Sequence, residues 1–279
     1  SYFIAATLFL LGLQRMSTPK TARSGIQWAG VGMLLATVAT FFLPGLHNIA
    51  LMLVAIVIGV GLNWVWGKKV AITDMPQMVA LFNGMGGGSA AAIGAVEMVK
   101  FSGGAPVPSQ LGLVLAVVGA LIGAVSLTGS IIAWAKLDGR MDKRYTFPGQ
   151  QYFNALVALA AVVCGVMAVT TLAMPWIIAF FLLALGLGKL MTLPIGGADM
   201  PVVISLYNAF TGLAVAFEGY VLGNEALIIA GTMVGAAGML LTRLMAKAMN
   251  RKISNVLFSN FGGSSAAMQE IGGSMKPIE

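Results

Sequence analysis

Long blocks of apolar residues constrain this chain more than any other feature of its sequence. Several blocks reach the roughly 20 residues that an α-helix needs to cross about 30 Å of hydrocarbon. Of the 279 residues, 58% are hydrophobic and only 9% are charged, whereas about 25% are charged in a typical soluble domain. A large soluble helical bundle would need polar helix faces, which are missing here. The sequence therefore predicts an all-α integral membrane protein.

The apolar blocks predict a polytopic bundle of about nine transmembrane helices. Each block is bounded by polar residues, glycine or proline, which mark the connections between helices. The expected spans are residues 2–14, 26–43, 48–66, 75–98, 110–136, 151–170, 175–193, 199–222 and 225–247.

Basic residues alternate between the predicted connections. Lysines and arginines gather in the segments that follow the first, third, fifth and ninth spans and near the ends of spans five, seven and nine, whereas the segments after spans two, four, six and eight hold Lys100 alone. Because Lys and Arg accumulate in cytoplasmic loops, we expect the N-terminus outside and the C-terminus in the cytoplasm, in the plasma (inner) membrane. The net charge of +7 follows from these loops, so no nucleic-acid partner is expected.

The two ends of the chain differ in character. The chain opens within an apolar run that has no basic segment before it, so the sequence predicts no signal peptide. Residues 253–279 contain Gly-Gly-Ser runs and no apolar span, a composition typical of a flexible linker. We therefore expect a membrane domain over residues 1–252 and a linker over residues 253–279, toward a soluble domain.

An internal repeat places polar residues inside the predicted bundle. Asp74-Met-Pro-Gln-Met-Val-Ala-Leu-Phe-Asn83 recurs as Asp199-Met-Pro-Val-Val-Ile-Ser-Leu-Tyr-Asn208. Both copies open a span at the predicted cytoplasmic face, so the repeat is expected to be parallel. Nine residues of helix rise about 13 Å, which puts Asn83 and Asn208 near the middle of the membrane.

The repeated residues have structural and functional interpretations. Asp74 and Asp199 precede a Met-Pro pair and suit the N-cap of a helix, or they act at the inner face. Asn83 and Asn208 need partners, because lipid offers none. They form either interhelical hydrogen bonds, each worth about 1 kcal/mol, or a polar wire with water across the bilayer centre.

Other polar residues lie outside the matched motif. Thr128 and Ser130 either bond back to the preceding helical turn or line the same path as the asparagines. His47, the only histidine, is either a polar surface residue or a proton acceptor on the outer face. Glu97 and Glu218 end the two repeat spans at the outer face and are expected to be solvated, with a part in proton entry as the alternative.

Glycine pairs spaced by four residues predict close packing between spans. The run from Gly84 to Gly88 lacks the strand context and the spacing of a dinucleotide-binding loop. Polar residues inside membrane spans indicate function, and conduction of protons or water suits these best. The glycine pairs are Gly84 and Gly88, Gly119 and Gly123, and Gly231 and Gly235.

Four motifs carry a resemblance to a known family. In chain order they are Thr73-Asp-Met-Pro-Gln-Met-Val-Ala, Thr128-Gly-Ser-Ile-Ile-Ala-Trp-Ala-Lys136, Ile195-Gly-Gly-Ala-Asp-Met-Pro-Val-Val-Ile-Ser205 and Lys247-Ala-Met-Asn-Arg251. Over nearly the whole chain, the sequence resembles the beta subunit of proton-translocating NAD(P) transhydrogenases. The resemblance implies a membrane domain that couples inward proton translocation to hydride transfer from NADH to NADP⁺.

The resemblance also implies cofactors and partners. In that family, soluble NAD(H) and NADP(H) domains exchange hydride outside the membrane, so this chain is expected to bind no cofactor and to hold no hydride-transfer site. The expected partners are the lipid bilayer, the membrane helices and NAD(H) domain of an alpha subunit, and the NADP(H) domain of the same subunit. The complex is expected to be a homodimer.

The resemblance assigns roles to individual residues. Ser130, Asn208 and Asp199 match family positions tied to proton translocation and to coupling with the NADP(H) domain. We expect Asp74 and Arg251 to share in the coupling.

Asn83 matches a position at which some family members have a proton-path histidine. Because asparagine cannot titrate, the proton carrier is expected on a companion subunit, with His47 or a water chain as the alternatives. Two other functions stay open. A secondary transporter of ions or solutes would more often show inverted repeats, and a structural anchor would not depend on its polar residues.

Overall fold

Helices form the whole regular structure of the described chain. The computed structural model describes residues 2–43, 45–107, 109–141 and 143–257. Within these ranges there is no strand, and nine helices have 15 to 28 residues each. The elements are α1 (Tyr2–Met16), α2 (Pro19–Thr40), α3 (Ile49–Lys69), η1 (Ile72–Asp74), α4 (Met75–Ser102), α5 (Gln110–Leu137), α6 (Gln150–Thr171), α7 (Met174–Thr192), η2 (Gly197–Asp199), α8 (Met200–Val221), α9 (Glu225–Ala248) and α10 (Ile253–Leu257).

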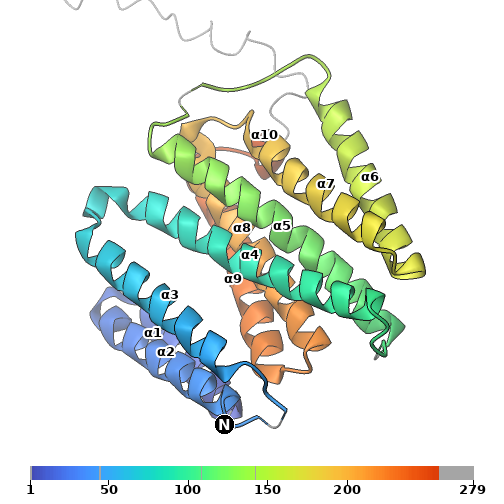
Figure 1. Ribbon diagram of the computed structural model, residues 1–279. Helices are drawn as coiled ribbons and strands as arrows, with labels where there is room; N and C mark the ends of the chain where they lie inside the picture. Colours follow the sequence, from blue (N-terminus) through green and yellow to red (C-terminus); the bar gives the residue numbers. More distant parts are fainter. Residues whose placement is uncertain (1, 44, 108, 142, 258–279) are drawn as a thin grey trace, which may run out of the picture.

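Each of the nine predicted spans coincides with one of the helices α1 to α9 (Figure 1). Seven of them, α3 to α9, are long and apolar enough to cross a membrane. Helix α1 is shorter, and α2 is less apolar because its first turns carry Lys20 and Arg23. The all-α fold is confirmed for the described residues and is consistent with a helical membrane bundle, whereas the count of nine spans and their orientation stay predictions.

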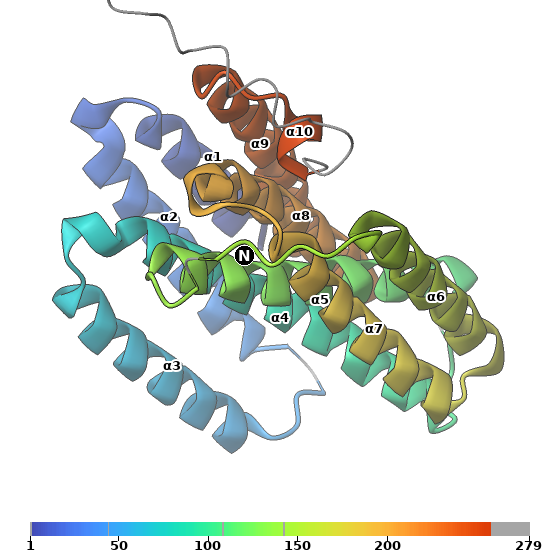
Figure 2. The same ribbon diagram turned by 90° about the horizontal axis from the view of Figure 1, so that it is seen from above.

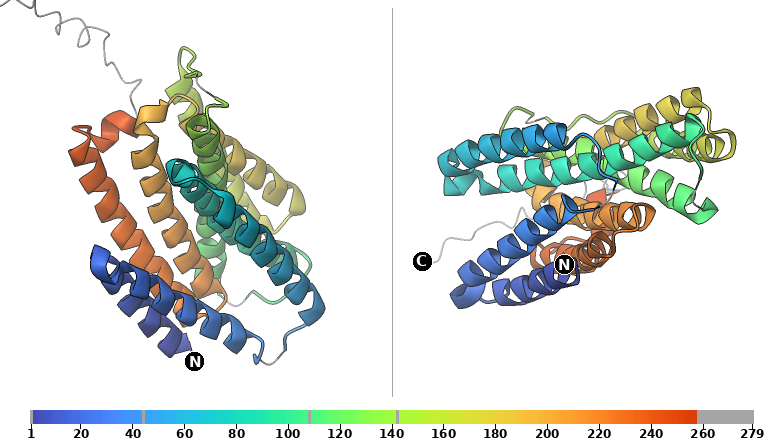
Figure 3. Two further views of the ribbon diagram at one scale, coloured as in Figure 1. Left: turned by 90° about the vertical axis from the view of Figure 1, so that its left-hand side faces the viewer. Right: turned by 60° about the horizontal axis from the view of Figure 1, so that its bottom comes forward.

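Helices α5 and α8 lie at the centre of the bundle. Helices α4, α7 and α8 pack against α5, α9 packs against α8, and α6 packs against α7. Helices α1 and α2 form a pair whose first member touches α9 (Figure 3). Helix α3 lies at the edge and buries no residue within this chain (Figure 2).

The two copies of the repeat share their local structure and run parallel. In each copy a short 3₁₀ turn, η1 or η2, precedes a helix that begins with Met-Pro. A Cβ added at Gly86 would lie 3.3 Å from Thr211 Cγ2, and one at Gly94 would lie 2.8 Å from Glu218 Oε1. Because these contacts advance together along both helices, α4 and α8 point the same way, as predicted.

One end of the bundle, which we call the basic end, gathers the starts of α4 and α8 and the ends of α5, α7 and α9. The last turns of these three ending helices carry Lys136, Lys189 and Lys247. The segment predicted as a linker begins with α10, which contacts α8 and α9. Residues 258–279 lie outside the described residues, so the linker stays a prediction.

Glycines bring the central helices into backbone contact. A Cβ added at Gly123 of α5 would lie 2.6 Å from the carbonyl oxygen of Gly87 in α4. A Cβ added at Gly231 of α9 would lie 2.6 Å from the carbonyl oxygen of Gly212 in α8. Close packing is the role of small residues at helix interfaces in membranes. The predicted packing of the glycine pairs is therefore confirmed for Gly123 and Gly231.

We expect Gly123→Val to destabilise the protein by about 1–3 kcal/mol, because overpacking forces the helices apart. The matched control is Gly59→Val in α3, where an added Cβ meets nothing within 4 Å. Thermal unfolding in detergent should show a lowered midpoint for Gly123→Val and an unchanged one for Gly59→Val. Equal midpoints for the two variants would contradict the role of this contact.

Candidate functional site

Four buried polar side chains join α4, α5 and α8 at the centre of the bundle. We call Asn83, Ser126, Ser130 and Thr211 the central network. The Nδ2 group of Asn83 donates to Ser130 Oγ at 2.9 Å and to Ser126 Oγ at 3.4 Å. Ser126 Oγ lies 2.5 Å from Thr211 Oγ1 and donates to the carbonyl oxygen of Tyr207 at 3.2 Å. Each of the four residues is at most 8% exposed.

Local sequence explains why these groups meet. Ser126 and Ser130 are one helical turn apart, so both face the same neighbours. Gly84, beside Asn83, lets α5 approach, since a Cβ added there would lie 3.1 Å from Ser130 Cβ. Asn83 Oδ1 is buried without a hydrogen-bond partner among the described residues. A buried carbonyl oxygen without a partner costs about 1–3 kcal/mol, so this oxygen is a suitable acceptor for a water molecule.

Asn208 lies at the level of Asn83 but outside the central network. The parallel course of α4 and α8 sets the two asparagines at matching heights, as predicted. Asn208 is half-buried, and no hydrogen bond joins its side chain to the network in the described part of the chain. Thr211, one turn further along α8, supplies the hydroxyl that meets Ser126.

Thr128, Ser130 and His47, the other residues predicted for the proton path, have different surroundings in the structure. Thr128 Oγ1 donates to the carbonyl oxygen of Ala124 at 3.2 Å, so its back-bonding interpretation is confirmed. Ser130 bonds to Asn83 on the neighbouring helix, and its place on a proton path stays a prediction. His47 is exposed in the α2–α3 connection, away from the central network.

A second buried polar contact lies between the central network and the basic end. The hydroxyl of Tyr207 is 2.6 Å from Thr192 Oγ1, and both residues are at most 1% exposed. The tyrosine ring packs on Gly129, where an added Cβ would lie 2.5 Å from Tyr207 Cζ. Because the carbonyl oxygen of Tyr207 also accepts from Ser126, hydrogen bonds extend from α4 to α7.

At the basic end the two repeated aspartates differ. Asp199 is 8% exposed, and its Oδ1 lies 3.5 Å from Nε of Arg251. Asp74 is exposed and accepts a hydrogen bond from Thr73 at 3.2 Å. Both aspartates occupy the N-cap position of their helices, as predicted, but neither makes a side-chain cap hydrogen bond.

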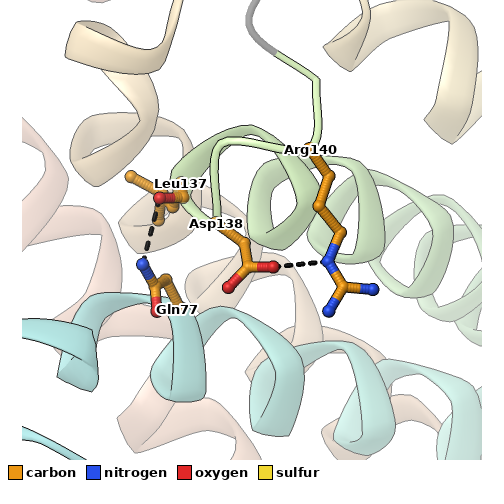
Figure 4. A network of polar contacts seen from close by, with 4 residues as sticks. All are labelled: Gln77, Leu137, Asp138 and Arg140. Carbon is orange, nitrogen blue, oxygen red and sulfur yellow. Dashed lines mark hydrogen bonds and ion pairs between the residues drawn. The ribbon is translucent and has the colours of Figure 1, made fainter.

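Further polar contacts fasten the ends of the helices there. Nζ of Lys136 donates to the carbonyl oxygens of Leu193 and Ile195, and so ties α5 to the connection between α7 and η2. Figure 4 shows Gln77 of α4 donating to the carbonyl oxygen of Leu137 at 3.0 Å, and the ion pair of Asp138 with Arg140 beside it. The start of α4, the end of α5 and the connection that leads through η2 into α8 are therefore joined at the basic end.

At the opposite end, one of two expectations about acidic residues is wrong. Glu97 is half-buried and pairs with Lys100 at 2.7 Å. Glu218 was expected to be solvated, but it is 1% exposed. Gly94 and Gly119 provide the space, because a Cβ at either position would lie within 2.8 Å of Glu218 Oε1.

Several residues of this site were not predicted from the sequence. Ser126 is one turn before Ser130, and Thr211 is one turn after Asn208, so the spacing of a helical face could have identified both. Nothing in the sequence pairs Thr192 with Tyr207, since the two lie on different helices.

We expect Ser126→Ala to cost about 1–3 kcal/mol of stability, because it leaves buried polar groups without partners. The control is Ser89→Ala on α4, where the hydroxyl is exposed and bonds within its own helix. Thermal unfolding in detergent should show a lower midpoint for Ser126→Ala alone. Matching midpoints would indicate that the Ser126 bonds contribute nothing to stability.

Taken together, the fold and the site define a helical membrane domain with a hydrogen-bonded polar network at its centre. The sequence matches the family described as NAD(P) transhydrogenase beta subunit over residues 1–278. It is 38% identical over 267 residues to the NAD(P) transhydrogenase subunit beta of Rhodospirillum rubrum, in an alignment that covers 94% of this chain and 58% of that protein. A second sequence of that name from the same species gives the same values.

The chain therefore belongs to the NAD(P) transhydrogenase beta subunit family. It spans about 58% of the length of these curated relatives.

Proposed function

We propose that this chain is the proton-conducting membrane domain of a proton-translocating NAD(P) transhydrogenase. In this role it couples inward proton translocation to hydride transfer from NADH to NADP⁺. The observation that supports this function best is the central network, which joins three apolar helices through buried hydrogen bonds. Polar groups at this depth are costly and are a functional hypothesis by default.

The proposal places the hydride chemistry outside this chain. NAD(H) and NADP(H) bind in associated soluble domains, the first on an alpha subunit and the second on the same subunit as this chain. The alpha subunit also supplies membrane helices, and the complex is a homodimer in the plasma (inner) membrane. Family membership supports these assignments, and the basic residues support a cytoplasmic basic end.

The central network suits the transfer of protons through water. Amide and hydroxyl groups both donate and accept hydrogen bonds, so they can orient a chain of water molecules without titrating. The unpartnered Oδ1 of Asn83 is the acceptor at which such a chain meets the network. Asn208 and Thr128 belong to the proposed path through the water that they contact, and His47 is its proposed outer acceptor.

Coupling operates through α8 in this proposal. Asp199 begins this helix with the ion pair to Arg251, and Thr211 lies twelve residues further, about 18 Å along the axis. A change in how the NADP(H) domain contacts Asp199, Arg251 and Asp74 shifts α8. The shift alters the bond between Thr211 and Ser126, which opens the path to one side at a time.

We expect Asn83→Leu and Asn208→Leu to lower proton-coupled turnover of the complete enzyme at least about tenfold, which corresponds to about 1.4 kcal/mol. Direct hydride exchange between bound nucleotides should persist, because it takes place outside the membrane. The control is Asn63→Leu in α3, where the amide bonds within its own helix. Retained coupling in either test variant would remove that asparagine from the path.

We expect Asp199→Asn to uncouple the enzyme more strongly than Asp74→Asn does. The burial of Asp199 and its pair with Arg251 make the difference, since exposed charges contribute little. Proton pumping and hydride transfer should be measured together in proteoliposomes. Equal loss in the two variants would show that the repeat acts symmetrically.

The second candidate function is a secondary transporter of ions or small solutes. Transporters of that kind often have inverted repeats and helices broken at mid-membrane. Here the repeat helices run parallel, and α4 and α8 are continuous from Met75 to Ser102 and from Met200 to Val221. Solute uptake by proteoliposomes in the absence of nucleotides would favour the transporter.

A further inference from the structure

Glu218 occupies a niche between three helices near the end of the bundle opposite the basic end. Its residue exposure is 1%. A Cβ added at Gly119 of α5 would lie 2.6 Å from Glu218 Oε1, and one at Gly94 of α4 would lie 2.8 Å from the same oxygen. The absence of side chains at these two glycines is therefore what admits the carboxyl group.

Neither carboxyl oxygen of Glu218 has a hydrogen-bond partner among the described residues. Glu97 of α4 is a charged residue near Glu218, and it pairs with Lys100 at 2.7 Å. Lys100 is thereby engaged by Glu97. A buried carboxylate without a partner costs several kcal/mol, so packing alone gives no reason for this group to be here.

Glu218 lies on the same interface as the central network. Thr211 and Glu218 are seven residues apart on α8, which is two turns and about 10 Å. The facing helices repeat this spacing, since Ser126 and Gly119 are seven residues apart on α5 and Gly87 and Gly94 are seven apart on α4. The interface between α4, α5 and α8 thus contains the central network and, two helical turns further on, the carboxyl group of Glu218.

The central network and Glu218 differ in chemistry. The amide and hydroxyl groups of the central network orient water but do not take up protons at neutral pH. A carboxyl group can take up and release a proton, which is the capacity that Asn83 lacks. This capacity had been expected on a companion subunit.

We propose that Glu218 is a proton-binding site of this chain, on the path between the central network and the side of the membrane opposite the basic end. The carboxylate takes a proton from hydronium and leaves water, then gives the proton to a water molecule on the network side. No other bond forms or breaks. The inference rests on the proposed function and names the group that carries the proton.

The test uses the complete transhydrogenase complex in proteoliposomes. Glu218→Gln keeps the size of the side chain and removes proton binding, so proton-coupled turnover should fall at least about tenfold while direct hydride exchange stays unchanged. The control is Glu225→Gln, which removes an exposed acid from the start of α9. Glu218→Asp keeps a carboxyl group and should restore a measurable part of the coupled rate.

A spectroscopic signature separates proton binding from a structural role. Infrared difference spectra of the wild type should contain the carbonyl band of a protonated carboxyl group that shifts in D₂O. The band should persist in Glu225→Gln and be absent in Glu218→Gln. If Glu218→Gln does not assemble, a membrane-soluble carbodiimide on the wild-type complex replaces it, and mass spectrometry should find the adduct on Glu218.

The outcomes distinguish this inference from the proposed function. A wild-type complex that exchanges hydride without moving protons overturns the proposed function, whatever the infrared band shows. A complex that pumps protons equally well with Glu218→Gln overturns the inference and leaves the proposed function standing. An infrared spectrum unchanged by Glu218→Gln, or no carbodiimide adduct on Glu218, also overturns it.

Discussion

Backbone contact between α4 and α5 is the constraint on which the other interactions depend. Gly87 and Gly123 bring the two helices so close that a single added Cβ meets a carbonyl oxygen at 2.6 Å. Only at this separation can the short side chain of Ser126 reach Asn83 on one neighbour and Thr211 on the other. In lipid, helices gain little from burying apolar surface against one another, so packing and hydrogen bonds hold them together. The glycine contact and the polar network therefore stabilise the same interface.

The repeat shows how similar local sequences acquire different surroundings. Both copies start with a 3₁₀ turn and a Met-Pro pair. Helix α8 is enclosed by α4, α5 and α9, whereas α4 has one side open to the surroundings of the bundle. The enclosed copy buries its aspartate against Arg251, and the open copy leaves Asp74 exposed. The asparagines show the reverse, since Asn83 is buried and bonds to Ser130 of α5, whereas Asn208 is half-buried and has no hydrogen bond to the central network in the described part of the chain.

The sequence predicted that the two asparagines lie at matching heights along parallel helices but not the direction in which each polar group points. Hydrophobic length located the helices to within a few residues, except that α2 begins at Pro19, seven residues before the predicted span, and the rise per residue set Asn83 and Asn208 at one height. The rotation of each helix about its axis depends on which neighbours it contacts. When all faces of a helix are apolar, the hydrophobic period does not predict this rotation. This is why Thr211 and Ser126 were missed, and why Glu218 was expected in water. Its niche depends on Gly94 and Gly119, two glycines on other helices.

The bonds of Lys136 have a consequence for how the basic end responds to force. Because Nζ is held by the carbonyl oxygens of Leu193 and Ile195, the connection leading into η2 is fastened to α5 as well as to α8. A displacement of that connection therefore acts on both α5 and α8 rather than on α8 alone. The relative slide of these helices decides whether Ser126 and Thr211 stay within reach. Lys136 thus determines how far a displacement of the connection slides α8 along α5, and how far it moves the two helices together.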